Sequence, residues 1–277
     1  MSLLFDILTT AAMLFIVTCG LLLIFGVMKI INFAHGGFLT LGGYAPLLVT
    51  QWGWNAWLGG PVALVIGLVF GAIVERAIVK PLHARPLDAI LATWGLGLII
   101  GQLITLGFGR GVQFVESPLS GTTTLFGADY SVYRLAMIGL ALLVAAVIAG
   151  VLNGTRLGLV TRAVTMNETL ARVLGVDSAR VRLSTFAFGA GLACLAGALI
   201  TPLSSVDPNM GVPWLTNAFM LAMISGTSLA SLAAACLVLG GAQVLVSVFA
   251  SPVLGALTIV VLGAVALRVR PQGFGRG

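Results

Sequence analysis

The sequence has very little charge, and this scarcity excludes most classes of soluble protein. Only 8% of its 277 residues are charged, 59% are hydrophobic, and the mean hydropathy is +1.14. Soluble globular domains carry about 25% charged residues. A chain this poor in charge cannot cover a water-facing surface, so we expect membrane lipid to surround most of it. The net charge of +6 therefore gives no reason to expect nucleic acid as a partner.

Residues that serve enzymatic and metal chemistry are also scarce. Neither Lys29 nor Lys80 is followed by Ser or Thr, so the phosphate-binding loop that ends in Gly-Lys-Ser/Thr is absent. Two histidines, His35 and His83, and three cysteines without a CxxC pair predict neither a metal site nor a redox centre. The carboxylates fall in or beside expected loops, which argues against a proton relay. We therefore expect a protein that is not an enzyme, with no catalytic residues and no cofactor of its own.

Long apolar runs are what the chain does contain. Membrane helices need about 17–25 apolar residues, and we predict nine apolar segments, some too short for a full crossing. They are 7–25, 38–49, 61–74, 87–108, 133–152, 183–203 and three segments between 214 and 267. Small residues at 189, 193 and 197 predict a face for close helix packing. The predicted fold class is all-α: a polytopic transmembrane bundle of eight or nine segments, some broken or re-entrant, in a single domain over 1–277.

One large basic segment interrupts the apolar runs. The loop at 153–182 holds five of the twelve arginines, and three more follow at 268, 270 and 276. Loops rich in arginine and lysine stay on the cytoplasmic side of a membrane. We therefore expect this loop and the C-terminus in the cytoplasm, and the N-terminus outside.

The basic loop also predicts a short helix. Thr165 with Glu168 three residues later forms a capping-box pattern, and Gly175 is a typical residue just past a helix end. On such a helix the apolar residues Met166, Leu170, Val173 and Leu174 share one face. This face either lies on lipid, packs under its own bundle, or docks onto a cytoplasmic partner. The residues expected to form the surface are Thr165, Met166, Glu168, Leu170, Arg172, Val173, Leu174 and Gly175.

Polar residues inside apolar runs are candidates for a solute path. The stretch 32–37 breaks the apolar pattern after the first run, and broken helices often line transporter cavities. A plain interfacial turn, with Asn32 and His35 as helix caps, is the alternative. Candidate path residues are Asn32, His35, Gly36, Thr93, Trp94 and Asn217, although a core role is the commoner explanation for Thr93 and Trp94.

Two specific motifs give the chain a resemblance to a known family. The segment 20–44, with its Asn-Phe-Ala-His-Gly-Gly core, resembles the opening of permeases of branched-chain amino acid ABC importers. The segment 162–167, followed by Gly175-Val176 and the run 183–197, resembles the coupling segment and next span of that family. The ending at 270–274 is also similar, so the resemblance covers nearly the whole chain.

The family resemblance implies a multi-part importer in the bacterial inner membrane. A periplasmic binding protein delivers solute, two homologous permeases form the path as a hetero- or homodimer, and two cytoplasmic subunits bind ATP–Mg. It also implies that the helix at 165–175 is the coupling helix. The segments 86–95 and 162–167 look closer to the urea and short-amide branch than to the leucine branch. Composition alone also permits a stand-alone channel or facilitator for a small neutral solute.

Overall fold

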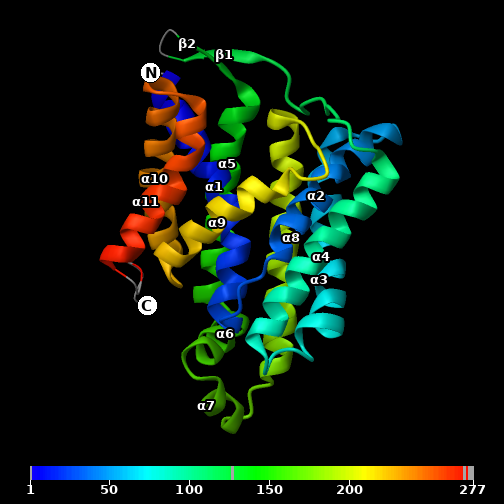
Figure 1. Ribbon diagram of the computed structural model, residues 1–277, viewed down its shortest axis with the longest axis vertical. Coiled ribbons are helices and arrows are strands. Elements are labelled where there is room, and N and C mark those ends of the chain that lie inside the picture. The colour runs from blue at the N-terminus through cyan, green and yellow to red at the C-terminus, as the bar shows by residue number, and fades with distance from the viewer. Residues whose placement is uncertain (1, 126–127, 271–272, 274–277) are drawn as a thin grey trace.

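The computed structural model describes residues 2–125, 128–270 and 273. Within these residues it is a helical bundle with one small hairpin (Figure 1). The elements are α1 (Ser2–Met28), α2 (Ala34–Gln51), a 3-10 turn (Ala56–Leu58), α3 (Gly59–Val74), a π-helical turn (Glu75–Val79), α4 (Pro86–Phe108), β1 (Thr122–Leu125), β2 (Ala128–Ser131), α5 (Val132–Gly154), α6 (Arg156–Met166), α7 (Glu168–Val173), α8 (Ser178–Ser204), α9 (Gly211–Ser225), α10 (Leu229–Phe249) and α11 (Pro252–Val269).

The predicted all-α transmembrane bundle is confirmed. In the described part of the chain, seven helical stretches are long and apolar enough to span a membrane, and α9 is a shorter apolar helix. Breaks at 225–228 and 251–252 separate α9, α10 and α11, so the apolar stretch 214–267 holds three helices, as predicted. The segment between the predicted runs 87–108 and 133–152 contains the β1–β2 hairpin, which the apolar pattern does not predict. The similar ending at 270–274, apart from residues 270 and 273, and the arginine at 276 lie outside the described residues.

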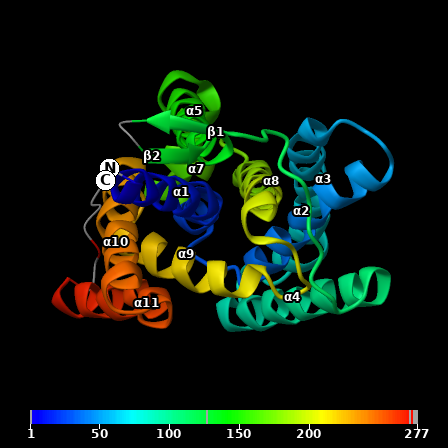
Figure 2. The same ribbon diagram turned by 90° about the horizontal axis from the view of Figure 1, so that it is seen from above.

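Helices α1 and α8 form the centre of the bundle. They are the two most buried spans, and α8 packs against α1, α2 and α3 (Figure 2). Glycines allow this close approach: a Cβ on Gly197 would lie 1.9 Å from the Leu39 carbonyl oxygen, and one on Gly189 would lie 2.7 Å from that of Gly20. The small-residue face predicted on α8 is therefore a packing face.

Two re-entrant stretches follow the two central helices. Each begins with a non-glycine residue in the left-handed region, Lys29 (φ 54°) after α1 and Ser205 (φ 65°) after α8. Such conformations are uncommon outside glycine and cluster at functional sites. The first break spans 29–33, so its predicted position at 32–37 was too late by a few residues, and His35 and Gly36 already belong to α2.

Helices α2 and α9, which follow the two re-entrant stretches, both begin deep in the bundle. The His35 ring nitrogen Nε2 lies 2.9 Å from the carbonyl oxygen of Val17, which is near the middle of α1. The first residue of α9, Gly211, packs so closely on Gly36 that a Cβ on it would lie 2.0 Å from the Gly36 oxygen. Helices α2 and α9 therefore start beside each other at mid-depth.

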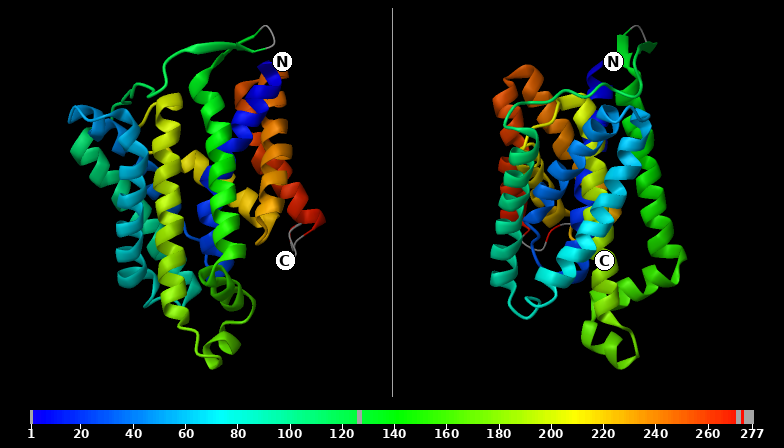
Figure 3. Two further views of the ribbon diagram at one scale, coloured as in Figure 1. Left: turned by 180° about the vertical axis from the view of Figure 1, so that it is seen from behind. Right: turned by 90° about the vertical axis from the view of Figure 1, so that its right-hand side faces the viewer.

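The two ends of the bundle differ in structure. The β1–β2 hairpin covers one end, here called the hairpin end, and α7 projects from the opposite α7 end, beyond the ends of α3 and α4 (Figures 1 and 3). At the hairpin end, Tyr130 of β2 donates a hydrogen bond to Asp6 of α1 (3.0 Å), and Arg134 of α5 pairs with the same carboxylate (3.2 Å). These contacts hold the hairpin over the start of α1.

Candidate coupling surface and solute cavity

Helix α6 is fixed tightly against the end of α5. Thr155 caps α6 by accepting a hydrogen bond from the Gly158 amide at 3.2 Å. A side chain at Gly158 would collide with the Leu152 carbonyl oxygen, 2.2 Å from an added Cβ, so the turn is as close as backbone allows. Val164 is buried, and α6 also contacts α1 and α8. The segment that leads to α7 is therefore part of the bundle rather than a loose loop.

Helix α7 begins two residues later in the chain than the capping-box pattern indicates. Thr165 does not cap it: its hydroxyl donates to the Thr161 carbonyl oxygen (2.8 Å), so α6 continues to Met166. The cap is Asn167, whose side chain accepts from the Leu170 amide (2.9 Å). Asparagine caps better than threonine, and the predicted helix at 165–175 is instead a six-residue helix that follows the end of α6 at Met166. Gly175, with φ 86°, follows it as predicted.

The four apolar side chains of the predicted face are uncovered, although Met166 ends α6 and the other three lie on α7 or directly after it. Met166, Leu170, Val173 and Leu174 are 87%, 56%, 79% and 74% exposed, whereas Ala171 on the other side of α7 is buried. Arg172 is also exposed. This exposure rules out the alternative in which the face packs under its own bundle. Four neighbouring apolar side chains at the tip of the molecule need either lipid or another protein to cover them.

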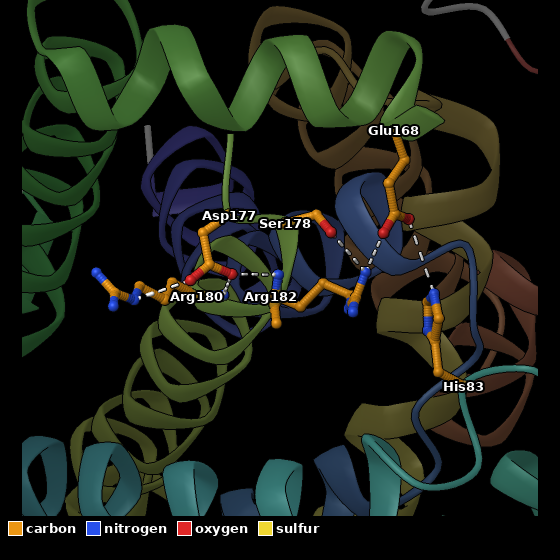
Figure 4. A network of polar contacts seen from close by, with 7 residues as sticks. His83, Glu168, Asp177, Ser178, Arg180 and Arg182 are labelled. Carbon is orange, nitrogen blue, oxygen red and sulfur yellow. Dashed lines mark hydrogen bonds and ion pairs between the residues drawn. The ribbon is translucent and has the colours of Figure 1, made fainter. Parts of the chain in front are cut away.

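A polar network lies beneath α7 and joins three elements (Figure 4). Glu168, the first residue of α7, accepts a charge-assisted hydrogen bond from Arg182 of α8. The same Arg182 nitrogen lies 3.4 Å from the Ser178 hydroxyl oxygen. On its other side the Glu168 carboxylate lies 3.8 Å from Nε2 of His83, in the turn between the π-helical turn and α4. Glu168 is therefore bound into the bundle rather than into the predicted capping box.

The network sets the ionisation of its two half-buried members, Glu168 and His83. Burial alone would raise the pKa of Glu168, but the hydrogen bond from Ser178 and the charge of Arg182 hold this pKa below its ordinary value. Burial, together with the charge of Arg182, lowers the pKa of His83, and the Glu168 carboxylate only partly opposes this shift. At neutral pH the cluster therefore contains a carboxylate, a guanidinium and a neutral imidazole.

A cavity of about 580 Å³ opens where α2 and α9 begin. Helix α4 forms its third wall and presents one face to it, at positions 94, 97, 98, 101, 102 and 105. The lining is mixed: Leu98, Val212 and Leu215 are apolar, whereas Arg110 and Asp207 carry opposite charges. Such a mixture of apolar surface and a few polar groups is typical of small-molecule sites.

The first turns of α2 and α9 both contribute residues to this cavity. Thr40 of α2 links the two helices, because its hydroxyl donates to the Gly36 carbonyl oxygen (3.1 Å) and accepts from the Gly211 amide (3.1 Å). Discontinuous helices that meet at mid-depth form the binding sites of many transporters. The stretch before α9 is tied to the segment after α4, since Gln113 and Val206 exchange two backbone hydrogen bonds.

The predicted path residues divide into three groups. Gly36 and Trp94 line the cavity. Thr93 supports it from behind, because its buried hydroxyl oxygen accepts a hydrogen bond from the Phe33 amide at 3.3 Å. Asn32 and His35 are buried against other parts of the bundle, and Asn217 of α9 is not among the lining residues.

Sequence reasoning missed most of the polar lining. Gln102 and Thr105 follow Trp94 on one helical face of α4, and this spacing was a usable signal. Thr40 and Asp207 carry no such signal, because only the re-entrant path of the chain brings them to the cavity. The missed polar and charged lining residues are Thr40, Gln102, Thr105, Arg110, Asp207, Asn209 and Thr216.

Comparison with known proteins relates nearly the whole chain to one family. The family described as "Branched-chain amino acid transport system / permease component" matches residues 3–269. The high-affinity branched-chain amino acid transport system permease protein LivH of Escherichia coli (strain K12) is 25% identical over 93% of this chain and 89% of its own length. The probable branched-chain amino acid transport permease protein LivH of Methanocaldococcus jannaschii is 28% identical over 77% of this chain and 70% of its own.

More distant similarities extend to other solutes and to a solved structure. The ribose import permease protein RbsC of Haemophilus influenzae is 28% identical over 61% of this chain and 52% of its own length. The structure titled "PsaBC from Streptococcus pneumoniae in complex with Fab" has a similar fold, with a TM-score of 0.52 and 16% identity, covering 98% of this chain and 93% of that one. The arrangement of helices described above therefore also occurs in a solved structure.

Proposed function

Because the chain belongs to the permease family of branched-chain amino acid transport systems, we propose that it forms half of the solute path of an ATP-binding-cassette importer. A second homologous permease, identical or related, forms the other half. Two separate cytoplasmic subunits bind ATP–Mg and drive transport, and a periplasmic solute-binding protein delivers the solute. The chain is a multi-pass protein of the inner membrane, with the α7 end and the C-terminus in the cytoplasm.

The observation that carries this proposal is the uncovered apolar face of α6 and α7. Met166, Leu170, Val173 and Leu174 are exposed. Helix α7 stands beyond the rest of the bundle (Figure 3), and α6, which supports it, packs against α1, α5 and α8. A channel or facilitator has no need of such a protruding surface. An importer needs such a surface, because the ATP-binding subunits must bind the permease and change its conformation. We assign Arg172 and Gly175, which flank this face, to the same surface.

The cavity between α2, α4 and α9 is proposed as the part of the solute path that this chain supplies. Trp94 lines it and is 56% exposed, so a second permease placed against α4 would complete the enclosure. Arg110 and Asp207 suit the carboxylate and ammonium groups of an amino acid. Leu98, Val212 and Leu215 suit an aliphatic side chain. This lining favours a branched-chain amino acid, and a small amide such as urea is the second candidate.

Uptake of labelled solute by the native host tests the proposal. Deleting the gene should abolish high-affinity uptake of leucine, and restoring the gene should restore uptake. A gene with Arg110→Gln should restore it only in part, because the solute carboxylate loses its partner. Loss of urea uptake alone would replace the amino acid with the amide. Unchanged uptake of leucine, urea and ribose after deletion would contradict the proposed path.

A further inference from the structure

The network of Glu168, Arg182 and His83 beneath α7, here called the cluster, contains a charge pair that joins two helices. Arg182 is nearly enclosed, its side chain being only 11% exposed, and its pair with Glu168 crosses between α8 and α7. A buried guanidinium needs a carboxylate nearby, because desolvation of an unpaired charge is costly. The partner that Arg182 uses here belongs to the short helix that carries the apolar face.

A second carboxyl group belongs to the π-helical turn that packs against α8, the helix of Arg182. Glu75, in the π-helical turn after α3, is only 1% exposed, and its Oε1 has no hydrogen-bond partner within the described residues. The charge of Arg182 acts on Glu75, and α8 contacts this π-helical turn. The Nε of Arg182 has no partner either. Unpaired buried polar atoms on both groups show that the cluster is not saturated in this conformation.

The cluster therefore joins α7 to the connection between α3 and α4, and α4 lines the cavity. Glu168 reaches α7, whereas His83 and Glu75 belong to the connection between α3 and α4. Helix α4 forms one wall of the solute cavity. A displacement of α7 would strain its bond to Arg182 and act on the α3–α4 connection through the same side chain. π-Helical turns recur at functional sites in helices.

We propose that Arg182 is a positioning residue that transmits movement of α7 to the α3–α4 connection by exchanging Glu168 for Glu75 as its carboxylate partner. In the conformation described here Arg182 binds Glu168, and α7 is held against α8. When the driving subunits pull α7 away, the guanidinium turns to Glu75 and carries the π-helical turn with it. The inference rests on the proposed function, since it needs a partner that moves α7.

A second ion pair in the same segment provides a control for the role of Arg182. Arg180 and Asp177 also form a close pair, at 2.9 Å, but they are neighbours on one helix turn and largely exposed, at 87% and 52%. That pair joins no two elements of the bundle, so it should contribute nothing to transmission. Arg180→Gln is therefore a matched control for Arg182→Gln.

The test is the ratio of solute transported to ATP hydrolysed by the complete importer in proteoliposomes. Arg182→Gln should lower this ratio at least tenfold while the ATP-binding subunits remain bound and hydrolyse ATP. Glu75→Gln should lower it too, and Arg180→Gln should leave it unchanged. Exchange of the charges, Glu168→Arg with Arg182→Glu, should restore α7 attachment but not the ratio, because Glu75 then has no arginine at position 182 to bind.

The outcomes separate this inference from the function on which it rests. A wild-type complex without ATP-driven uptake would refute the proposed function itself. Active wild type with an unchanged ratio in Glu75→Gln would overturn the exchange of partners. Glu75→Gln keeps the shape of the side chain and removes only its carboxyl group, so it decides the matter even if Arg182→Gln fails to assemble. A spin label at Thr169, on exposed α7, should become mobile during turnover in wild type.

Discussion

Leu170 offers the sharpest test of the coupling surface. It lies at the centre of the exposed face of α7 and is 56% exposed, while the buried Ala171 beside it faces the bundle. Leu170→Ala shortens the side chain without adding charge. Leu170→Asp places a carboxylate where we expect the ATP-binding subunit to seat. Both changes leave the network beneath α7 intact.

The size of each effect follows from the exposed fraction. Burying a whole leucine side chain contributes about 1.5–3 kcal/mol. Docking can bury only the half of Leu170 that is still exposed, so Leu170→Ala should weaken binding by about 1 kcal/mol, roughly fivefold in Kd. Burying an unpaired carboxylate costs several kcal/mol. Leu170→Asp should therefore weaken binding by more than about 100-fold.

The assay measures binding of the purified ATP-binding subunits to the permease in nanodiscs. Val112→Asp is the matched control, because Val112 is similarly exposed (54%) but lies in the segment after α4 at the hairpin end. It should not change the Kd. Thermal unfolding should show that all three variants are folded. Equal affinity of wild type and Leu170→Asp would refute the docking surface, and an equal loss in both Leu170 variants would refute the burial argument.

Three other changes test the packing, the cavity and the cluster. Gly197→Ala should destabilise the protein by about 1–3 kcal/mol in thermal unfolding, since its Cβ would lie 1.9 Å from a carbonyl oxygen of α2. Thr40→Val should reduce uptake without changing binding of the ATP-binding subunits, because it leaves the Gly211 amide without its acceptor. Acidification from pH 7.5 to 5 should loosen α7, measured by spin-label mobility, because the lowered pKa of His83 makes its protonation unfavourable in the folded state. The Glu168 carboxylate stabilises the attachment of α7 fully above about pH 4.5. This stabilisation is lost at lower pH, because the pKa of Glu168 is also lowered in the folded state.

Each of these predictions has a control or a contrary outcome. Gly139→Ala, where an added Cβ meets nothing within 4 Å, should leave the unfolding temperature almost unchanged. Thr40→Ser keeps the acceptor and should retain uptake. Spin-label mobility on α7 that does not change between pH 7.5 and 5 would show that the cluster does not hold α7. A normal unfolding temperature for Gly197→Ala would mean that α2 and α8 are not packed as described.

The apolar pattern predicted the bundle well because lipid imposes one dominant rule on spanning segments. Every long apolar run became a helix, and the weak breaks at 225–228 and 251–252 were real. The pattern failed where local hydrogen bonds compete. Thr165 matched a capping box, but its hydroxyl bonded back to the preceding turn and Asn167 took the cap.

The cavity was harder to predict than the exposed apolar residues of α6 and α7. The apolar face at 166–174 is local in sequence, so its spacing alone revealed it. The cavity is assembled from α2, α4 and the stretch before α9, which are far apart in the chain. His35 and Asn32 were plausible path residues as intramembrane polar groups, yet their side chains are buried away from the cavity lining. Only the re-entrant course of the chain decides which polar residues line the cavity.

ATP dependence of uptake tests the central claim most directly. The chain is reconstituted in proteoliposomes with its partner permease, its ATP-binding subunits and the solute-binding protein, and entry of labelled leucine is followed. The account predicts accumulation against a gradient with ATP and none with a non-hydrolysable analogue, and it predicts loss of accumulation in Leu170→Asp. Uptake that only equilibrates, at the same rate with and without ATP, would identify a facilitator and contradict the account.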